Sequence, residues 1–207
     1  MINLLGFLAE RDSSETSGAE GPAYSRLASF QEFCSGMKVM AKPPSFATVT
    51  RDVYPPAGPL QGLTLAQAHA IATAIASAAA HLHASGICHG DLYAHNILVD
   101  PAHVGPAAAA AAAAESQQWV KLGDLGAAFF YTPGSEQGAL VERVEVRAWA
   151  CLVEELLGLV SDGGGGSALE GSLRALSASC GALGGSVAAR PSFAEIVAAL
   201  GKAGAGV

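Results

Sequence analysis

Charged residues are scarce in this chain of 207 residues, where Asp, Glu, Lys and Arg together make up 14%. Soluble domains usually carry roughly 25%. Eleven basic residues against 18 acidic ones give a net charge of −7. Nucleic acids and anionic membrane surfaces are bound by clusters of Lys and Arg, so this balance argues against either as a partner.

Cysteine and long apolar runs are also sparse. Cys34, Cys88, Cys151 and Cys180 form no CxxC pair, which argues against a zinc site or a small secreted disulfide framework. We therefore expect reduced thiols in an intracellular, cytoplasmic protein. The N-terminus lacks the basic stretch of a signal peptide. The most apolar long window, residues 64–82, is alanine-rich and interrupted by polar residues, so it predicts a buried helix and no membrane span.

The pattern of apolar, turn-forming and capping residues predicts a mixture of short strands and longer helices. Thr64 is a candidate N-cap for one helix and Gly86 its stop signal. Residues 24–40 fit either type of element. Residues 10–21 and 163–166 are expected to be linkers, and 101–118 a low-complexity insertion with eight consecutive alanines. Strands are predicted at 2–9, 45–53, 97–99 and 120–122, the last two as a hairpin, and helices at 64–84, 141–159, 168–179 and 192–200.

The chemistry of the chain is concentrated in two stretches. Asp91 and Asn96 lie five residues apart in HGDLYAHNIL, after the predicted buried helix, and Asp124 follows a predicted strand in LGDLG. Carboxylate and amide oxygens suit a magnesium ion held against phosphate. A further carboxylate can accept a proton from an attacking hydroxyl. Taken singly, each Asp would be read as a turn former.

Taken together and in this order, these motifs resemble the protein kinase superfamily. HGDLYAHNIL is similar to the catalytic loop H-R-D-L-x-x-x-N, and KLGDLG to the metal-binding D-F-G turn, with Leu125 in place of Phe. RVEVRAWACLVEELL resembles the long central helix of the kinase C-lobe, with Glu145 where Asp is usual. RPSFAEIVAAL resembles the last helix, and INLLGF with SFATVTRDVYPPAG the fourth and fifth strands and the hinge.

The resemblance implies an α+β protein-kinase-like fold, mainly a helical C-lobe with short β hairpins and a truncated N-lobe. Residues 1–56 would be the N-lobe remnant, and 57–207 the C-lobe with the insertion at 101–118. It also implies an enzyme that uses ATP and Mg²⁺ to phosphorylate a hydroxyl of a protein substrate, with Ser/Thr as the family default.

The resemblance also assigns roles to individual residues. Asp91 would orient or deprotonate the acceptor hydroxyl, and Asn96 and Asp124 would hold the magnesium ion. Glu145 would accept N–H groups of the catalytic loop, and His89 would pack beneath Leu125. The nucleotide would further contact Leu98 under the adenine and the backbone of Arg51, Asp52 and Val53 at its edge.

Several departures from the family pattern matter. Gly90 replaces the Arg that reads a phosphorylated activation loop, so activity should not depend on such phosphorylation. Tyr93 and His95 stand where kinases place Lys or Arg. The interval from Asp124 to Glu145 is short and lacks A-P-E, and we expect Arg190 to pair instead with Glu142.

No GxGxxG motif or lysine-bearing strand precedes these elements in the chain. We therefore expect residues 1–207 alone to bind ATP weakly and to transfer phosphate near background. Two alternatives stay open: a pseudokinase scaffold that binds partner proteins, and a small-molecule phosphotransferase of the aminoglycoside or choline kinase type. The latter group shares the H-G-D form of the loop, but RPSFAEIV and VEVRAWACLVEELL favour the protein kinase reading.

Overall fold

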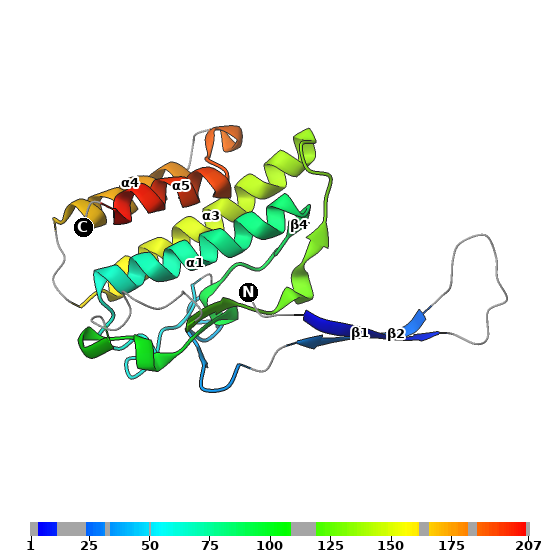
Figure 1. Cartoon of the computed structure of the whole chain (residues 1–207), viewed down its shortest axis with the longest axis horizontal. Helices are drawn as coiled ribbons and strands as arrows, with labels where there is room; N and C mark the ends of the chain where they lie inside the picture. The colour runs from blue at the N-terminus through cyan, green and yellow to red at the C-terminus, as the bar shows by residue number, and fades with distance from the viewer. Residues whose placement is uncertain are drawn as a thin grey trace. The chain divides into compact units, whose positions relative to one another are not determined.

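The computed structural model describes residues 4–11, 24–31, 34–49, 51–108, 119–161, 166–181 and 186–205. It divides into two compact units, Met1–Ser35 and Gly36–Val207. The first unit contains an antiparallel pair of strands, β1 (Leu4–Arg11) and β2 (Tyr24–Gln31), in register from Leu4 opposite Gln31 to Arg11 opposite Tyr24 (Figure 1). The first predicted strand is thus confirmed with a shift of two residues, and the ambiguous stretch contains a strand. The linkers predicted at 10–21 and 163–166 lie almost wholly outside the described residues.

Four long helices build most of the second unit. They are α1 (Leu65–Ala84), α3 (Glu136–Leu159), α4 (Ala168–Gly181) and α5 (Phe193–Gly204). Helices α1 and α3 run side by side, and α4 and α5 cover them on one side (Figure 1). All four predicted helices are therefore confirmed, although α3 begins five residues earlier than expected.

The boundaries of α1 follow from its local sequence. The Thr64 hydroxyl accepts the N–H of Gln67 at 3.3 Å, and the Gln67 side chain accepts the N–H of Thr64 at 3.1 Å. This reciprocal capping box satisfies two N–H groups that the helix itself leaves unpaired. At the other end, Gly86 has a φ of +69°, a conformation that favours glycine and ends the helix.

Short antiparallel strands carry the loops between the helices. In one sheet β5 (Ile97–Val99) lies between β3 (Lys38–Val39) and β6 (Val120–Leu122), which confirms the predicted hairpin. In the other, β4 (Ile87–Cys88) pairs with β7 (Phe129–Phe130). Of the insertion between β5 and β6, residues 109–118 lie outside the described part of the chain.

The strand predicted at 45–53 is wrong. Residues 46–49 form a turn, in which the Ser45 N–H donates to the Thr48 hydroxyl at 2.8 Å and Val49 adopts a φ of +56°. Ser and Thr hydroxyls compete with strand pairing by bonding nearby backbone groups, and here they outweigh the β propensity of the segment. Only Val53 keeps an extended pairing, through an isolated bridge to Lys42.

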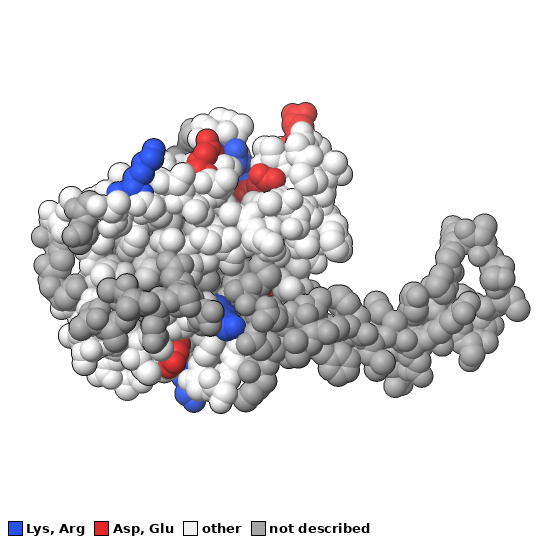
Figure 2. All heavy atoms as spheres, in the orientation of Figure 1, with Lys and Arg blue, Asp and Glu red and all other residues white. Residues whose placement is uncertain are grey.

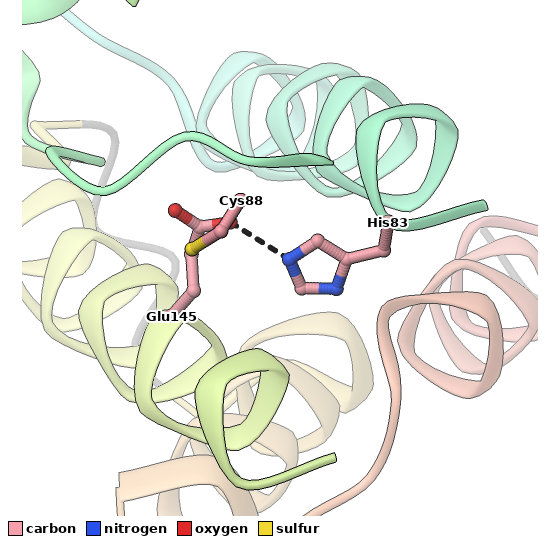
Figure 3. A group of neighbouring side chains, drawn as sticks. All are labelled: His83, Cys88 and Glu145. Atoms are coloured by element: carbon pink, nitrogen blue, oxygen red, sulfur yellow. Dashed lines mark hydrogen bonds and ion pairs between the residues drawn. The ribbon is translucent and has the colours of Figure 1, made fainter. Parts of the chain in front are cut away.

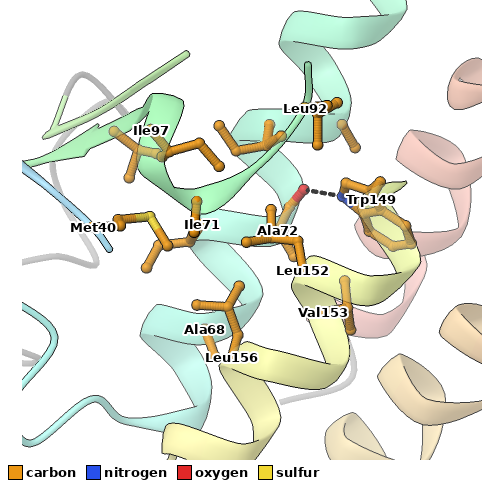
Figure 4. Close-up of a cluster of buried hydrophobic side chains, with 14 of the residues drawn as sticks. Met40, Ala68, Ile71, Ala72, Leu92, Ile97, Trp149, Leu152, Val153 and Leu156 are labelled. Carbon is orange, nitrogen blue, oxygen red and sulfur yellow. Dashed lines mark hydrogen bonds between the residues drawn. The ribbon is translucent and has the colours of Figure 1, made fainter. Parts of the chain in front are cut away.

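The core of the second unit lies where α1 faces α3. Ile71 and Ala72 of α1 and Trp149 of α3 are at most 1% exposed, and the indole N–H of Trp149 donates to the carbonyl oxygen of Ala72 at 3.0 Å (Figure 4). Small alanines on α1 let α3 approach closely, while each large apolar side chain contributes about 1.5–3 kcal/mol on burial. Met40 joins this core, so residues 36–56 pack with the larger unit. The predicted N-lobe remnant at residues 1–56 and C-lobe at residues 57–207 stay predictions.

The model has the predicted α+β class, mostly helical with a few short antiparallel strands. None of the helices in the described part of the chain combines the length and apolarity needed to cross a membrane. Charged side chains on the face drawn in Figure 2 are few, scattered and of both signs, in line with the low charge content of the sequence.

Candidate active site

The loop after β4 brings Asp91 and Asn96 together. The Asn96 side-chain amide donates to the Asp91 carboxylate and to the Asp91 carbonyl oxygen, both at 2.9 Å. A short 3-10 helix, Ala94–Asn96, provides the bend that turns Asn96 back towards Asp91. These two contacts fix one carboxylate oxygen of Asp91 and leave Oδ1 of Asn96 as the ligand atom of its amide group.

Backbone contacts bring the Asp124 segment to the same loop. The ring of His89 is fully buried, and its Nε2 lies 2.8 Å from the carbonyl oxygen of Gly123. The N–H of Gly123 donates to the carbonyl oxygen of Asn96 at 2.9 Å. Gly123 is thus held by both ends of the catalytic loop, one residue before Asp124. The expected packing of His89 beneath Leu125 stays a prediction.

Asp124 itself has the geometry of a tight turn. Its φ is +53°, its side chain is exposed, and Oδ1 accepts the N–H of Gly126 at 3.0 Å. Left-handed backbone is costly for a residue other than glycine, and such strain concentrates at functional sites. Asp124 and Asn96 together offer a carboxylate and an amide oxygen, the donor type that a hard divalent cation prefers, so the residues fit a magnesium ion.

The carboxylate of Glu145, on α3, holds the loop that carries Asp91 by accepting hydrogen bonds from its backbone. Its two carboxylate oxygens accept the N–H groups of Gly90 at 2.8 Å and His89 at 3.3 Å, which is the contact that the resemblance implied. The Nε2 atom of His83, at the end of α1, lies 2.8 Å from Oε2 of the same carboxylate. Burial alone would raise the pKa of Glu145, but the hydrogen bonds from His83, Gly90 and His89 outweigh it and lower that pKa.

Figure 3 shows Cys88 beside this pair, with the ligand-type atoms of His83, Cys88 and Glu145 within 4.8 Å of one another. Burial, followed by the charge of Glu145, raises the pKa of the Cys88 thiol to about 12, which keeps it neutral. Since the Glu145 carboxylate already accepts three hydrogen bonds, we assign this cluster to support of the loop rather than to metal binding.

The glycine of H-G-D is required by the fold. Gly90 has a φ of +78°, and a Cβ atom there would lie 2.4 Å from the carbonyl oxygen of Ala127. An Arg at this position would clash with the segment that follows Asp124. Glycine at position 90 therefore allows this loop to lie against the backbone of Ala127, in the segment that follows Asp124.

The side chain of Asp52 contacts the same loop, while the expected contact of its backbone with adenine stays a prediction. Its carboxylate is 1% exposed and accepts both the N–H of His95 at 3.0 Å and the His95 ring nitrogen Nδ1 at 2.9 Å. The opposite ring nitrogen of His95 lies 3.6 Å from Oδ2 of Asp91. The Asp52 carboxylate therefore fixes the backbone and ring of His95, and that ring lies between Asp52 and Asp91.

The other two residues of the expected adenine edge are engaged as well. Arg51 pairs with Glu155 of α3 at 3.0 Å. Both the N–H and the carbonyl oxygen of Val53 bond Lys42 at 2.9 Å. Contact of the Val53 backbone with an adenine edge would require this bridge to open. The adenine-edge roles of Arg51, Asp52 and Val53 stay predictions. Leu98 lies in β5, paired with Val39 and Lys121, and its place under the adenine stays a prediction.

The expected ion pair of Arg190 with Glu142 is wrong. Arg190 does reach α3, but its Nη1 donates to the carbonyl oxygen of Arg143 at 3.0 Å. Glu142 instead accepts the hydroxyl of Tyr131 at 2.7 Å. Glu142 is thus engaged with Tyr131, the residue after β7, and Arg190 with the backbone of α3.

Comparison with known families supports the kinase reading of this loop. The model of the lipopolysaccharide kinase (Kdo/WaaP) family matches residues 60–114, which span α1, β4, the catalytic loop and β5. No curated protein matches the chain. The matched family belongs to the protein kinase-like superfamily, and the mostly helical α+β fold is consistent with a kinase-like C-lobe with a reduced N-lobe. This match supports kinase-like phosphoryl transfer from ATP, with use of a divalent metal.

Sequence reasoning did not find the supporting roles of His83 and Asp52. His83 lies in the last turn of an alanine-rich helix, where nothing in the sequence points to a partner 62 residues away. The contact of Asp52 with His95 spans 43 residues. Both depend on how separate elements pack, which local patterns do not encode.

Proposed function

We propose that this chain is the C-lobe of a phosphotransferase that carries the terminal phosphate of ATP to a hydroxyl of a small acceptor of the carbohydrate type. The match to the lipopolysaccharide kinase family supports the kinase part, and the acceptor named in that family's description supports a carbohydrate acceptor. The match gives no support to the protein acceptor that the sequence motifs led us to expect.

One structural observation favours a small acceptor over a protein. Helix α3 begins at Glu136 with Ser135 as its cap, so only residues 125–134 lie between Asp124 and the capped helix. Protein kinases dock a peptide on a long segment that follows the metal-binding turn. In this chain that segment is short, because α3 begins at Glu136. A short segment leaves the acceptor to be held by the catalytic loop and α3.

The chain's own residues suit the chemistry as follows. Asp91, with one carboxylate oxygen held by Asn96, would orient the acceptor hydroxyl and take its proton. Asn96 and Asp124 would hold the magnesium ion, which neutralises charge on the ATP phosphates when it is bound. Glu145 and His89 would keep the two segments at a fixed spacing, because phosphoryl transfer depends mainly on positioning.

The test is phosphate transfer from radiolabelled ATP to a panel of sugars, with Asp91→Asn beside the unchanged chain. Removing the base of a positioned site typically costs 10²–10⁴-fold in rate, so even slow transfer should fall to background in the variant. The matched control is Asp100→Asn, which changes a partly exposed acid that accepts the N–H of Ala102 at the start of η2 (Pro101–His103), and it should transfer as the original does. Transfer that survives Asp91→Asn, or nucleotide binding without transfer to any acceptor, would reject the proposal, the latter in favour of a pseudokinase scaffold.

A further inference from the structure

A cavity of about 750 Å³ lies between the outer side of the catalytic loop and α3. Leu92, Tyr93 and Ala94, the three residues after Asp91, form one wall, and α3 forms another from Val144 to Glu155. Its volume is within the range of sites that bind small molecules.

Three arginines converge on this cavity in a chain whose net charge is −7. They are Arg51, Arg147 and Arg190, and the one acid in the lining is Glu155, while Glu154 outside it lies 3.8 Å from Arg51. Glu155 is already committed, since it pairs with Arg51 at 3.0 Å and accepts the Tyr54 hydroxyl at 2.8 Å. That pairing holds the guanidinium of Arg51 in place and raises its pKa.

The other two arginines keep their charge for a ligand. Arg190 donates to the neutral carbonyl oxygen of Arg143, which fixes its guanidinium without cancelling its charge. Arg147 lies on the exposed side of α3. Guanidinium groups bind phosphate and carboxylate through paired N–H donors, so fixed arginines around a cavity favour an anion.

Two stacked rings, those of Tyr93 and His95, lie between the cavity and the proposed catalytic base Asp91. Tyr93, which lines it, stacks on His95 with ring centres 5.6 Å apart. His95 in turn lies 3.6 Å from the Asp91 carboxylate. A molecule whose anionic group is held by the arginines would thus have its remaining atoms beside the catalytic loop.

We infer that this cavity is the acceptor site and that the acceptor carries a phosphate or carboxylate group in addition to the hydroxyl that is phosphorylated. The role of the bound molecule as phosphate acceptor rests on the proposed function. The binding of an anion in the cavity does not depend on it. Leu92, Val144 and Leu152 give it an apolar floor, which suits the carbon skeleton of such a molecule.

Binding is measured by NMR titration of the chain, without nucleotide, with glucose 6-phosphate, glucuronate and glucose. We expect at least one of the two anionic sugars to shift the signals of Tyr93 and Ala94, and glucose to leave them unchanged. Arg147→Gln and Arg190→Gln should each weaken that binding about 10-fold, the loss expected for one charged hydrogen bond. Arg174→Gln, which breaks an exposed pair with Glu170 on α4 outside the cavity, is the matched control and should bind as the original does.

The arms of the experiment separate the possible results. Shifts with the phosphate sugar alone indicate a phosphorylated acceptor, and shifts with glucuronate alone a carboxylated one. Equal shifts with all three sugars or with none, or anion binding that neither Arg147→Gln nor Arg190→Gln weakens, would overturn the inference. Since Arg147 is exposed, its variant should fold even if that of Arg190 does not. Anion binding with no phosphate transfer would leave the cavity site standing and reject only the proposed function.

Discussion

The carboxylate of Glu145 on α3 accepts the backbone N–H of Gly90 at 2.8 Å. A buried side chain of the central helix thereby holds the residue that precedes Asp91. His83 and the N–H of His89 share the same carboxylate, which ties α1, the catalytic loop and α3 at one point. Its loss should affect both stability and the position of Asp91.

Glu145→Ala should therefore lower the free energy of unfolding by about 3–5 kcal/mol, because it leaves the His83 ring and the backbone N–H groups of His89 and Gly90 without their acceptor. Urea denaturation measures the change. Glu154→Ala, an exposed acid on the same helix with a side chain 56% exposed, should change stability by no more than about 0.5 kcal/mol. Equal changes in the free energy of unfolding for the two substitutions would show that the hydrogen bonds of Glu145 do not stabilise the fold.

The lowered pKa of Glu145 predicts a pH dependence of stability. A carboxylate whose pKa is lower in the folded state stabilises the fold above its usual value of about 4.5, and this contribution is lost as pH falls through the folded pKa. Melting temperatures measured downward from pH 6 should fall less steeply in Glu145→Gln than in the original chain. Parallel curves for the two proteins would contradict the assigned pKa direction.

Gly90→Ala should be strongly destabilising, by more than about 1 kcal/mol, since φ is +78° and the added Cβ would meet the Ala127 carbonyl oxygen at 2.4 Å. The matched control is Gly171→Ala within α4, where no atom lies within 4 Å of the new Cβ. That change should stabilise the chain by about 0.5–1 kcal/mol, because Ala favours helices. Thermal unfolding of the two variants checks both signs, and a tolerated Gly90→Ala would contradict the close approach.

Asp52→Ala should loosen the catalytic loop without removing a nucleotide contact. The N–H and the ring of His95 lose a buried acceptor, at a cost of about 1–3 kcal/mol in stability. Hydrogen exchange should show a faster-exchanging His95 amide, while the apparent affinity for ATP stays unchanged. Weaker ATP binding with an unchanged His95 amide would contradict the loop-supporting role of the Asp52 side chain.

Features that depend on residues close together in the sequence could be predicted, whereas contacts between residues far apart in the sequence could not. The Thr64 cap, the β5–β6 hairpin and the helix around Trp149 are encoded by neighbouring residues, and the sequence predicts them. Glu145 was placed correctly because it occupies a family position, although its His83 partner was not foreseen. The strand at 45–53 failed because side-chain hydrogen bonds of Ser45 and Thr48 decide that turn. The partner of Arg190 could not be predicted because it depends on how Arg190 packs against the backbone of α3, 47 residues away.

The central claim is that Asn96 and Asp124 hold a divalent metal against the phosphates of a bound nucleotide. The most direct measurement is an electron paramagnetic resonance titration of Mn²⁺, in place of Mg²⁺, with ADP and the 207-residue chain. We predict nucleotide-dependent Mn²⁺ binding that is weak, that Asp124→Asn and Asn96→Ala abolish, and that Asp100→Asn leaves intact. Mn²⁺ binding of equal strength in all four proteins, or in none of them, would contradict the account.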